Sequence, residues 1–297
     1  MTDTTSEQDD NTTGPDLSRR DFVAMSLAAG AGMAVAGPAS AAVPVTEKDV
    51  DLTTPDGTCD AVFIHPTSGR HPGVIVWADA FGLRPALVEM GRRLAGEGYA
   101  VLVPNPYYRV AHGQVLDTAT FDFQNQADRA RLGPLMGSIT AAGAAERDAR
   151  AFIAFLDAQP EVDTAKKIGT QGYCMGGPLV MRTASVSDRI GAGASFHGGG
   201  LVTTGADSPH LLAPKIHARM YFGVAANDDE RQPDAKDTLR EAFAAAKVPA
   251  EIEVYRNAQH GWCMPDMPLQ NGMPIYSRPD AERAWGKLLA LYEAGLS

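Results

Sequence analysis

Short apolar runs alternate along the chain with segments in which apolar residues recur every three or four positions. The run at 49–66 is interrupted by Pro55-Asp56-Gly57, a turn sequence that predicts a β-hairpin. Further strands are predicted within 72–82, 99–106, 166–173, 190–200, 217–229 and 250–259, and helices within 84–98, 144–159, 175–185, 233–248 and 276–295. This alternation predicts an α/β fold with a mainly parallel sheet that is covered by helices on both faces. Residues 105–140 are predicted to be irregular, with a short helix.

The bulk composition is that of a globular protein with a substantial core. The chain has 297 residues, of which 44% are hydrophobic and 21% are charged. Its net charge is −10 and it has no long run of Lys or Arg, which disfavours nucleic acid or an anionic membrane surface as a partner. We therefore expect a small-molecule ligand and one catalytic domain over 42–297, as a monomer or a dimer.

The first 41 residues resemble an export signal. Arg19 and Arg20 precede an Ala- and Gly-rich apolar stretch at 22–37, and small residues follow at 39–41. This order is typical of a twin-arginine signal, and the stretch is too short and too rich in glycine for a stable membrane span. The sequence therefore predicts cleavage near Ala41 and a periplasmic or extracellular location. The alternative is a polar tail with two chance arginines.

The chain has three cysteines, Cys59, Cys174 and Cys263. An odd number leaves at least one thiol free unless it pairs between chains, and a bridge between Cys59 and Cys263 stays open. The spacings include no CxxC pair and no zinc-type His/Cys cluster, so we expect neither a metal or other cofactor nor a thiol redox function.

One cysteine stands where a parallel sheet would place a nucleophile. Gly172-Tyr173-Cys174-Met175-Gly176 has the form G-x-C-x-G between a predicted strand and a predicted helix. Glycines on both sides allow the strand and helix to pack closely around the turn, and the helix N-terminus favours a thiolate. The alternative is an ordinary glycine turn with a buried structural cysteine.

The later strands supply partners in the order that this motif requires. Asp228 follows the strand at 217–229, with Asp229 beside it as the second choice, and His260 follows the last strand. His260 would activate the Cys174 thiol, and Asp228 would orient the imidazole. Backbone amides of Met175 and of Ala80, at the end of an earlier strand, are the predicted oxyanion donors.

Several segments together resemble the dienelactone hydrolase family of α/β-hydrolases. They are GYCMGG at 172–177, WADAFG at 77–82, LAGEGYAVLVPNPYYR at 94–109, AANDD at 225–229 and AQHGW at 258–262. The resemblance covers roughly 50–296 and implies hydrolysis of small esters or lactones by a Cys-Asp-His triad without a metal or cofactor. Within the family's pattern, Asp79 takes the place of a glutamate that modulates the cysteine, and Arg109 matches one of two carboxylate-binding arginines. Met264 stands where the second arginine would be.

Other residues are weaker candidates for contact with a substrate or for modulation of the site. His197 ends the strand after the cysteine helix and is equally consistent with a structural role. Trp262 follows His260 closely and could form an apolar wall, although aromatic residues are more often part of ordinary packing. The leading hypothesis is an exported cysteine-dependent ester or lactone hydrolase. A thioesterase or peptidase of the same fold, or a non-catalytic binding protein on this scaffold, is the alternative.

Overall fold

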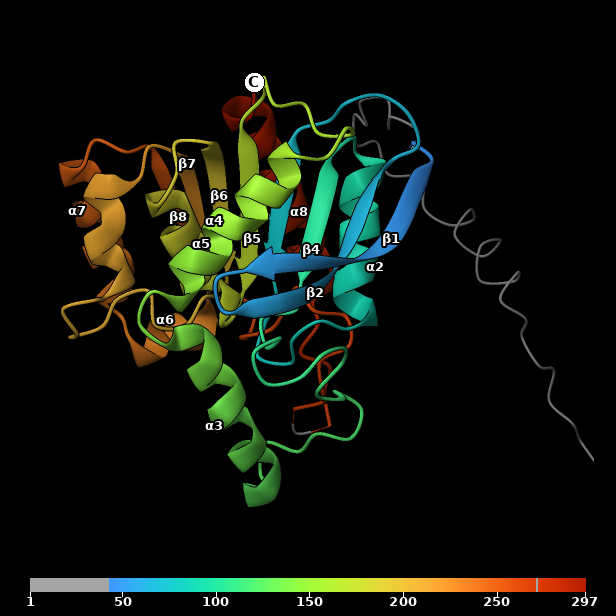
Figure 1. Cartoon of the computed structure of the whole chain (residues 1–297). Helices are drawn as coiled ribbons and strands as arrows, with labels where there is room; N and C mark the ends of the chain where they lie inside the picture. Colours follow the sequence, from blue (N-terminus) through green and yellow to red (C-terminus); the bar gives the residue numbers. More distant parts are fainter. Residues whose placement is uncertain (1–42, 271) are drawn as a thin grey trace, which may run out of the picture. The chain divides into compact units, whose positions relative to one another are not determined.

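The computed structural model describes residues 43–270 and 272–297. The predicted export signal at 1–41 lies outside these residues. The described chain contains an eight-stranded sheet in the order β1-β2-β4-β3-β5-β6-β7-β8 (Figure 1). The strands are β1 (Val45–Thr54), β2 (Gly57–Pro66), β3 (Gly73–Trp77), β4 (Ala100–Pro104), β5 (Ile168–Tyr173), β6 (Ile190–Phe196), β7 (Arg219–Ala225) and β8 (Ala250–Tyr255).

The predicted hairpin and the predicted parallel sheet are both present. β1 pairs with β2, and β2 with β4, in antiparallel fashion, whereas all pairs from β4 through β3 and β5 to β8 are parallel. The central strands β3, β4 and β5 are buried at every position, as expected for strands that are covered on both faces. The parallel pairing places the carboxyl ends of β3, β5, β7 and β8 along one edge of the sheet.

Helices cover the two faces of the sheet (Figure 1). They are α2 (Pro85–Gly96), α3 (Gln126–Thr140), α4 (Ala144–Asp157), α5 (Gly176–Ser185), α6 (Ala226–Arg231), α7 (Ala235–Ala245) and α8 (Arg278–Gly295), together with the 3-10 helix η2 (Pro209–Lys215). One core cluster includes Leu87 of α2 and Leu288 of α8. The other includes Phe152 of α4 and Leu179 of α5. The apolar faces of these helices therefore form two cores, one on each side of the sheet.

Two differences from the sequence expectation affect the site. The region 105–140 contains α3, a helix of 15 residues rather than a short one. Asn125 caps it, because its side chain accepts hydrogen bonds from the amides of Ala127 and Asp128. The predicted strand at 217–229 ends at Ala225, so Asp228 lies in the first turn of α6.

No helix in the described part of the chain is long and apolar enough to cross a membrane.

Candidate active site

Cys174 occupies a sharp turn between β5 and α5. Its φ angle is 51°, in the left-handed region that costs an L-residue conformational energy. Gly172 and Gly176 make the turn possible by their lack of a side chain. A Cβ on Gly172 would overlap the carbonyl of Gly176, and a Cβ on Gly176 would lie 2.7 Å from the carbonyl oxygen of Trp77. The backbone geometry therefore requires glycine at both positions and presents the Cys174 side chain at the end of the strand.

His260 and Asp228 meet although 32 residues separate them in the chain. The His260 Nδ1 lies 2.7 Å from Asp228 Oδ2, and the His260 backbone amide donates to the side chain of Asn227 at 2.9 Å. Asp229 instead accepts a hydrogen bond from Lys236 at 2.7 Å. Of the two neighbouring acids, Asp228 is thus the one that contacts the histidine.

The charge state of His260 reflects its two acidic neighbours. Burial lowers the pKa of this imidazole, but hydrogen bonding to Asp228 and to Cys174 outweighs burial and raises the pKa to about 10. The protonated ring is therefore favoured near neutral pH. An imidazolium in contact with a thiol stabilises the thiolate, the nucleophilic form of cysteine.

The predicted oxyanion donors lie on two adjoining segments. Met175 begins the turn into α5, and Ala80 follows β3. Within the described residues, neither of their amides donates a hydrogen bond to another protein group. The Tyr107 hydroxyl, fully buried, lies 2.9 Å from the Ala80 carbonyl oxygen and 3.3 Å from the Met175 sulfur, and so links the two segments.

Asp79 belongs to a buried ion pair that the sequence did not predict. Its two carboxylate oxygens accept hydrogen bonds from Arg84 at 2.7 and 2.9 Å, and one also accepts from the Phe81 amide. Arg84, only 2% exposed, donates as well to Asp266, which lies 182 residues further along the chain. Asp79 is therefore held at the end of β3 by a charged partner, and this contact fixes its orientation.

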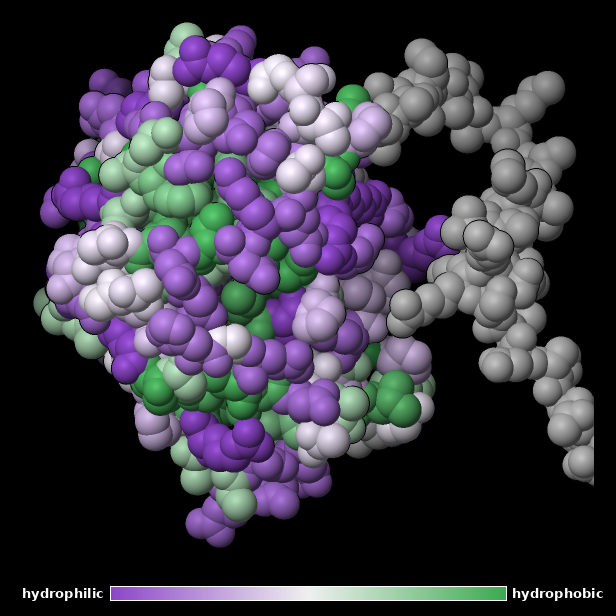
Figure 2. All heavy atoms as spheres, turned by 45° about the vertical axis from the view of Figure 1, so that its right-hand side comes forward, coloured by the Kyte–Doolittle hydropathy of each residue, from purple (hydrophilic) through white to green (hydrophobic). Residues whose placement is uncertain are grey.

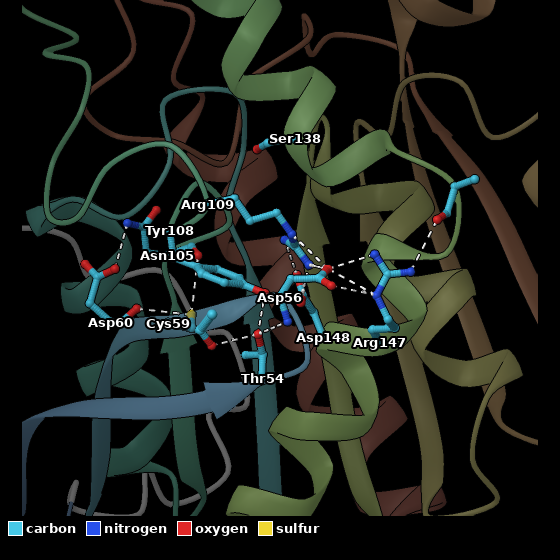
Figure 3. Close-up of polar contacts among 12 residues, drawn as sticks. Thr54, Asp56, Cys59, Asp60, Asn105, Tyr108, Arg109, Ser138, Arg147 and Asp148 are labelled. Atoms are coloured by element: carbon cyan, nitrogen blue, oxygen red, sulfur yellow. Dashed lines mark hydrogen bonds and ion pairs between the residues drawn. The ribbon is translucent and has the colours of Figure 1, made fainter.

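Arg109 is engaged by two carboxylates (Figure 3). Its guanidinium donates to Asp56, at the tip of the β1–β2 hairpin, and to the fully buried Asp148 of α4, with distances of 2.6–3.0 Å. The same guanidinium lies over the ring of Tyr108, whose hydroxyl donates to Asp148. All three guanidinium nitrogens thus have protein acceptors, which ties Arg109 to the hairpin and α4.

His197 and Trp262 are buried behind His260. His197 is 1% exposed and has a φ angle of 40°, and its ring lies edge-on to those of His260 and Trp262 with centroid separations of 5.0 and 5.1 Å. The Cys174 amide donates to His197 Nδ1 at 3.1 Å. Trp262 is fully buried and stacks on Tyr255. Both side chains are too buried to line a substrate pocket. His197 nevertheless contacts the backbone of the nucleophile, Cys174, directly.

The remaining thiols are single and buried. Cys59 and Cys263, like Cys174, are free, and burial raises the pKa of both buried thiols. Over 43–270 and 272–297, no cluster of three or more His, Cys, Asp or Glu side chains could hold a metal ion. Cys174 is the only one of the three with partial exposure. Cys174, at the turn before α5, is therefore the thiol that a ligand can reach.

Comparisons with known proteins agree with this geometry. A model of the dienelactone hydrolase family matches residues 59–295. A carboxymethylenebutenolidase of Pseudomonas sp. (strain P51) is 30% identical over 181 residues, which are 61% of this chain and 70% of that protein. Two solved structures, m3DLH and the dienelactone hydrolase-like promiscuous phosphotriesterase P91 from metagenomic libraries, have TM-scores of 0.70 and 0.69 at 28% and 27% identity. Each alignment covers 85% of this chain and 99% of the other.

The family match spans most of the described chain, and the structural matches span nearly the whole length of their counterparts. The eight-stranded sheet, with its helices and its cysteine turn after β5, has the arrangement of an α/β-hydrolase. The chain therefore belongs to the dienelactone hydrolase family and is an ester or lactone hydrolase with the α/β-hydrolase fold.

Proposed function

We propose that this protein cleaves small esters or lactones by nucleophilic catalysis with Cys174, Asp228 and His260. The observation that carries the proposal is the 2.7 Å contact between His260 and Asp228 beside a cysteine in a left-handed turn. A nucleophile, a base and an acid that orients the base are the groups that acyl transfer to a thiol requires. The raised pKa of His260 supports an imidazolium that stabilises the thiolate.

In the first half of the reaction, the Cys174 thiolate attacks the carbonyl carbon of the substrate. The amides of Ala80 and Met175 would donate to the resulting oxyanion. The carbon–oxygen bond to the alcohol then breaks, and His260 gives its proton to the departing oxygen. In the second half, His260 takes a proton from a water molecule that attacks the thioester. The acid product leaves, and the thiolate and imidazolium form again.

Cys174→Ala provides the direct test. The variant removes the sulfur atom but keeps the fold, and we expect kcat for short activated esters to fall by about a thousandfold or more. Cys263→Ala is a matched control, because it removes a buried thiol outside the triad. Unchanged turnover in Cys174→Ala would exclude the covalent mechanism through Cys174, whereas equal losses in both variants would point to general destabilisation. Absence of ester turnover in the unchanged protein would favour a binding protein.

Four further residues have supporting roles in this proposal. Asp79, through its ion pair with Arg84, would keep the loop that carries Ala80 in place. His197 would position the Cys174 backbone, and Trp262 would support the His197 ring. Arg109 would act through the hairpin rather than by contact with a substrate, because all its guanidinium nitrogens already have acceptors.

We also propose that the protein is exported by the twin-arginine route. The support is sequence alone: Arg19 and Arg20, the apolar stretch at 22–37 and the small residues at 39–41. This route carries folded proteins, so a chain with three free thiols would need no disulfide to form after transport.

A further inference from the structure

Two cavities lie beside the proposed catalytic groups. The larger, of about 800 Å³, has the His260 ring in its wall. The smaller, of about 400 Å³, is lined by Met175, the residue that follows the nucleophile. His260 would protonate the departing alcohol, so the alcohol part of a substrate leaves on the side of the larger cavity. The Met175 amide would hold the carbonyl oxygen, which places the acyl chain near the smaller cavity.

One part of the larger cavity's wall is aromatic and apolar, and the rest is polar, with Gln124, Asn227 and Arg231 among its residues. Phe121 and Phe123 form one side, with ring centroids 4.9 Å apart in an edge-to-face arrangement. Met267, Leu269 and Ile275 lie in the wall as well. Phe123 and Leu269 are 42% and 65% exposed, which is unusual for large apolar side chains. An aromatic or apolar group of the substrate would cover these side chains and remove them from water.

One part of the smaller cavity's wall is aliphatic, and the rest includes Glu146, Arg182 and Asp207. Met136 and Ile139 of α3 and Leu179 of α5 contribute its apolar lining together with Met175. Cys174 packs against the same core cluster that contains Ile139 and Leu179. A short aliphatic acyl chain fits such a wall better than a charged one, because a buried carboxylate without a partner loses its hydration.

The cations of both walls already have acidic partners. In the larger cavity, Arg231 lies 3.3 Å from Asp228, and His260 contacts the same carboxylate. In the smaller cavity, Arg182 pairs with Glu146 at 2.7 Å. Among the described lining residues, no cation is left without a carboxylate neighbour, and the chain as a whole has a net charge of −10. An anionic substrate would therefore lose hydration without gaining a free counter-ion.

From these two walls we infer that the substrate is an uncharged ester with an aromatic or bulky apolar alcohol and a short aliphatic acyl chain. This inference rests on the proposed hydrolytic function and specifies which esters the site accepts. The alcohol would occupy the cavity beside Phe123, and the acyl chain the cavity beside Met175.

A matched pair of substrates tests the charge requirement. 4-Carbamoylphenyl butyrate and 4-carboxyphenyl butyrate have nearly the same size and differ by one charge on the alcohol. We expect kcat/KM for 4-carboxyphenyl butyrate to be lower than that for 4-carbamoylphenyl butyrate by roughly tenfold or more. The succinamate and hydrogen succinate esters of 4-carbamoylphenol make the same comparison on the acyl side, with the same expected direction.

Substitution of a residue in the larger cavity tests whether the alcohol part of the substrate binds there. Phe123→Ala should raise KM for 4-carbamoylphenyl butyrate by roughly threefold or more, with little change for methyl butyrate, because only the aromatic alcohol reaches that wall. Leu211→Ala is the control, since Leu211 is 52% exposed on η2, outside both cavities. Equal KM changes in the two variants would overturn the assignment of the larger cavity to the alcohol.

The outcomes of these experiments distinguish failure of the substrate inference from failure of the proposed hydrolytic function. Turnover of 4-carboxyphenyl butyrate equal to that of its amide, with both reactions lost in Cys174→Ala, would keep the hydrolytic mechanism and overturn the preference for uncharged esters. Failure to hydrolyse any of these esters would contradict the proposed function itself.

Discussion

His197 is the residue whose position says most about how the nucleophile is held. The Cys174 amide donates to its Nδ1, so the proton of the neutral ring resides on Nε2, a buried atom without a hydrogen-bond partner among the described residues. Burial and the nearby His260 keep the pKa of His197 well below its usual value. The ring therefore stays neutral beside a protonated His260, and its acceptor remains available to the cysteine turn.

Two substitutions distinguish this acceptor from mere filling of space. His197→Asn keeps an acceptor near the Nδ1 position and tolerates the left-handed φ angle, so kcat should stay close to that of the unchanged protein. His197→Gln places its amide further out and leaves the Cys174 amide with the Phe196 carbonyl, at 3.1 Å, as its remaining acceptor, which should lower kcat roughly threefold with little change in KM. The measurements are steady-state kinetics and the rate of Cys174 alkylation by iodoacetamide. Equal kcat values for the two variants would contradict the positioning role.

At this scale, the sequence predicted individual positions better than pairings. The glycine–cysteine turn was recognisable because its conformation requires glycine at 172 and 176. The partly buried pair of Arg84 with Asp266 was not, because the two residues lie 182 positions apart and neither belongs to a recognisable motif. Short-range steric rules can be read from a sequence, whereas a contact across the fold depends on how loops meet in space.

Among the elements, the β1–β2 hairpin contacts α4 through charged as well as apolar side chains. Asp56 at its tip accepts hydrogen bonds from Arg109 and from Arg147 of α4 (Figure 3). The hydrogen bonds of Arg147 and Arg109 lower the pKa of Asp56 to about 2. The Asp56 carboxylate therefore ties the tip of the hairpin to a helix on one face of the sheet.

Removal of that charge should destabilise the protein in a pH-dependent way. A depressed carboxyl pKa stabilises the folded state above the unfolded value of 3.8 and loses this effect as pH falls through about 2. Asp56→Asn should thus lower the free energy of unfolding by up to about 1 kcal/mol at pH 6, after allowance for solvent screening. The difference should shrink between pH 4 and pH 2 in urea titrations. A difference that stays constant over this range would show that the ion cluster does not act through the Asp56 charge.

The helices and strands themselves were largely predictable from apolar spacing. The hairpin turn and the helices α2, α4, α7 and α8 lie where the pattern placed them. α3 was underestimated because its exposed surface is mostly polar and only Leu135 and Ile139 are buried, so it lacks the periodicity of a helix that packs along its whole length. The order of the strands in the sheet follows from tertiary packing and had no local signal.

For the whole molecule, the export proposal depends on the chain's pairs of adjacent arginines. On the face in Figure 2, hydrophilic side chains surround and separate several apolar patches. The twin-arginine prediction depends on two adjacent arginines, and the chain contains a second such pair, Arg92 and Arg93 of α2, on the surface of the folded part. This second pair offers a matched control for the first.

Substitution of each pair tests export directly. Arg19→Lys with Arg20→Lys should leave the protein inside the cell, because the export machinery reads the arginines themselves and not only their charge. Arg92→Lys with Arg93→Lys should leave export unchanged. Cell fractionation followed by immunoblotting measures both. Export of the first variant at the same level as the second would contradict the signal assignment.

Gly176 has a consequence for how this site responds to redesign. It lies against the carbonyls of Trp77 and Ala78 with no room for a Cβ, so at this point the start of α5 touches the main chain at the end of β3. This backbone contact limits the spacing between the Ala80 and Met175 amides, and the Tyr107 hydroxyl bridges the same two segments. A library of pocket variants that keeps Gly176 and Tyr107 can therefore alter which alcohols and acyl chains are accepted and should retain the same pair of amide donors.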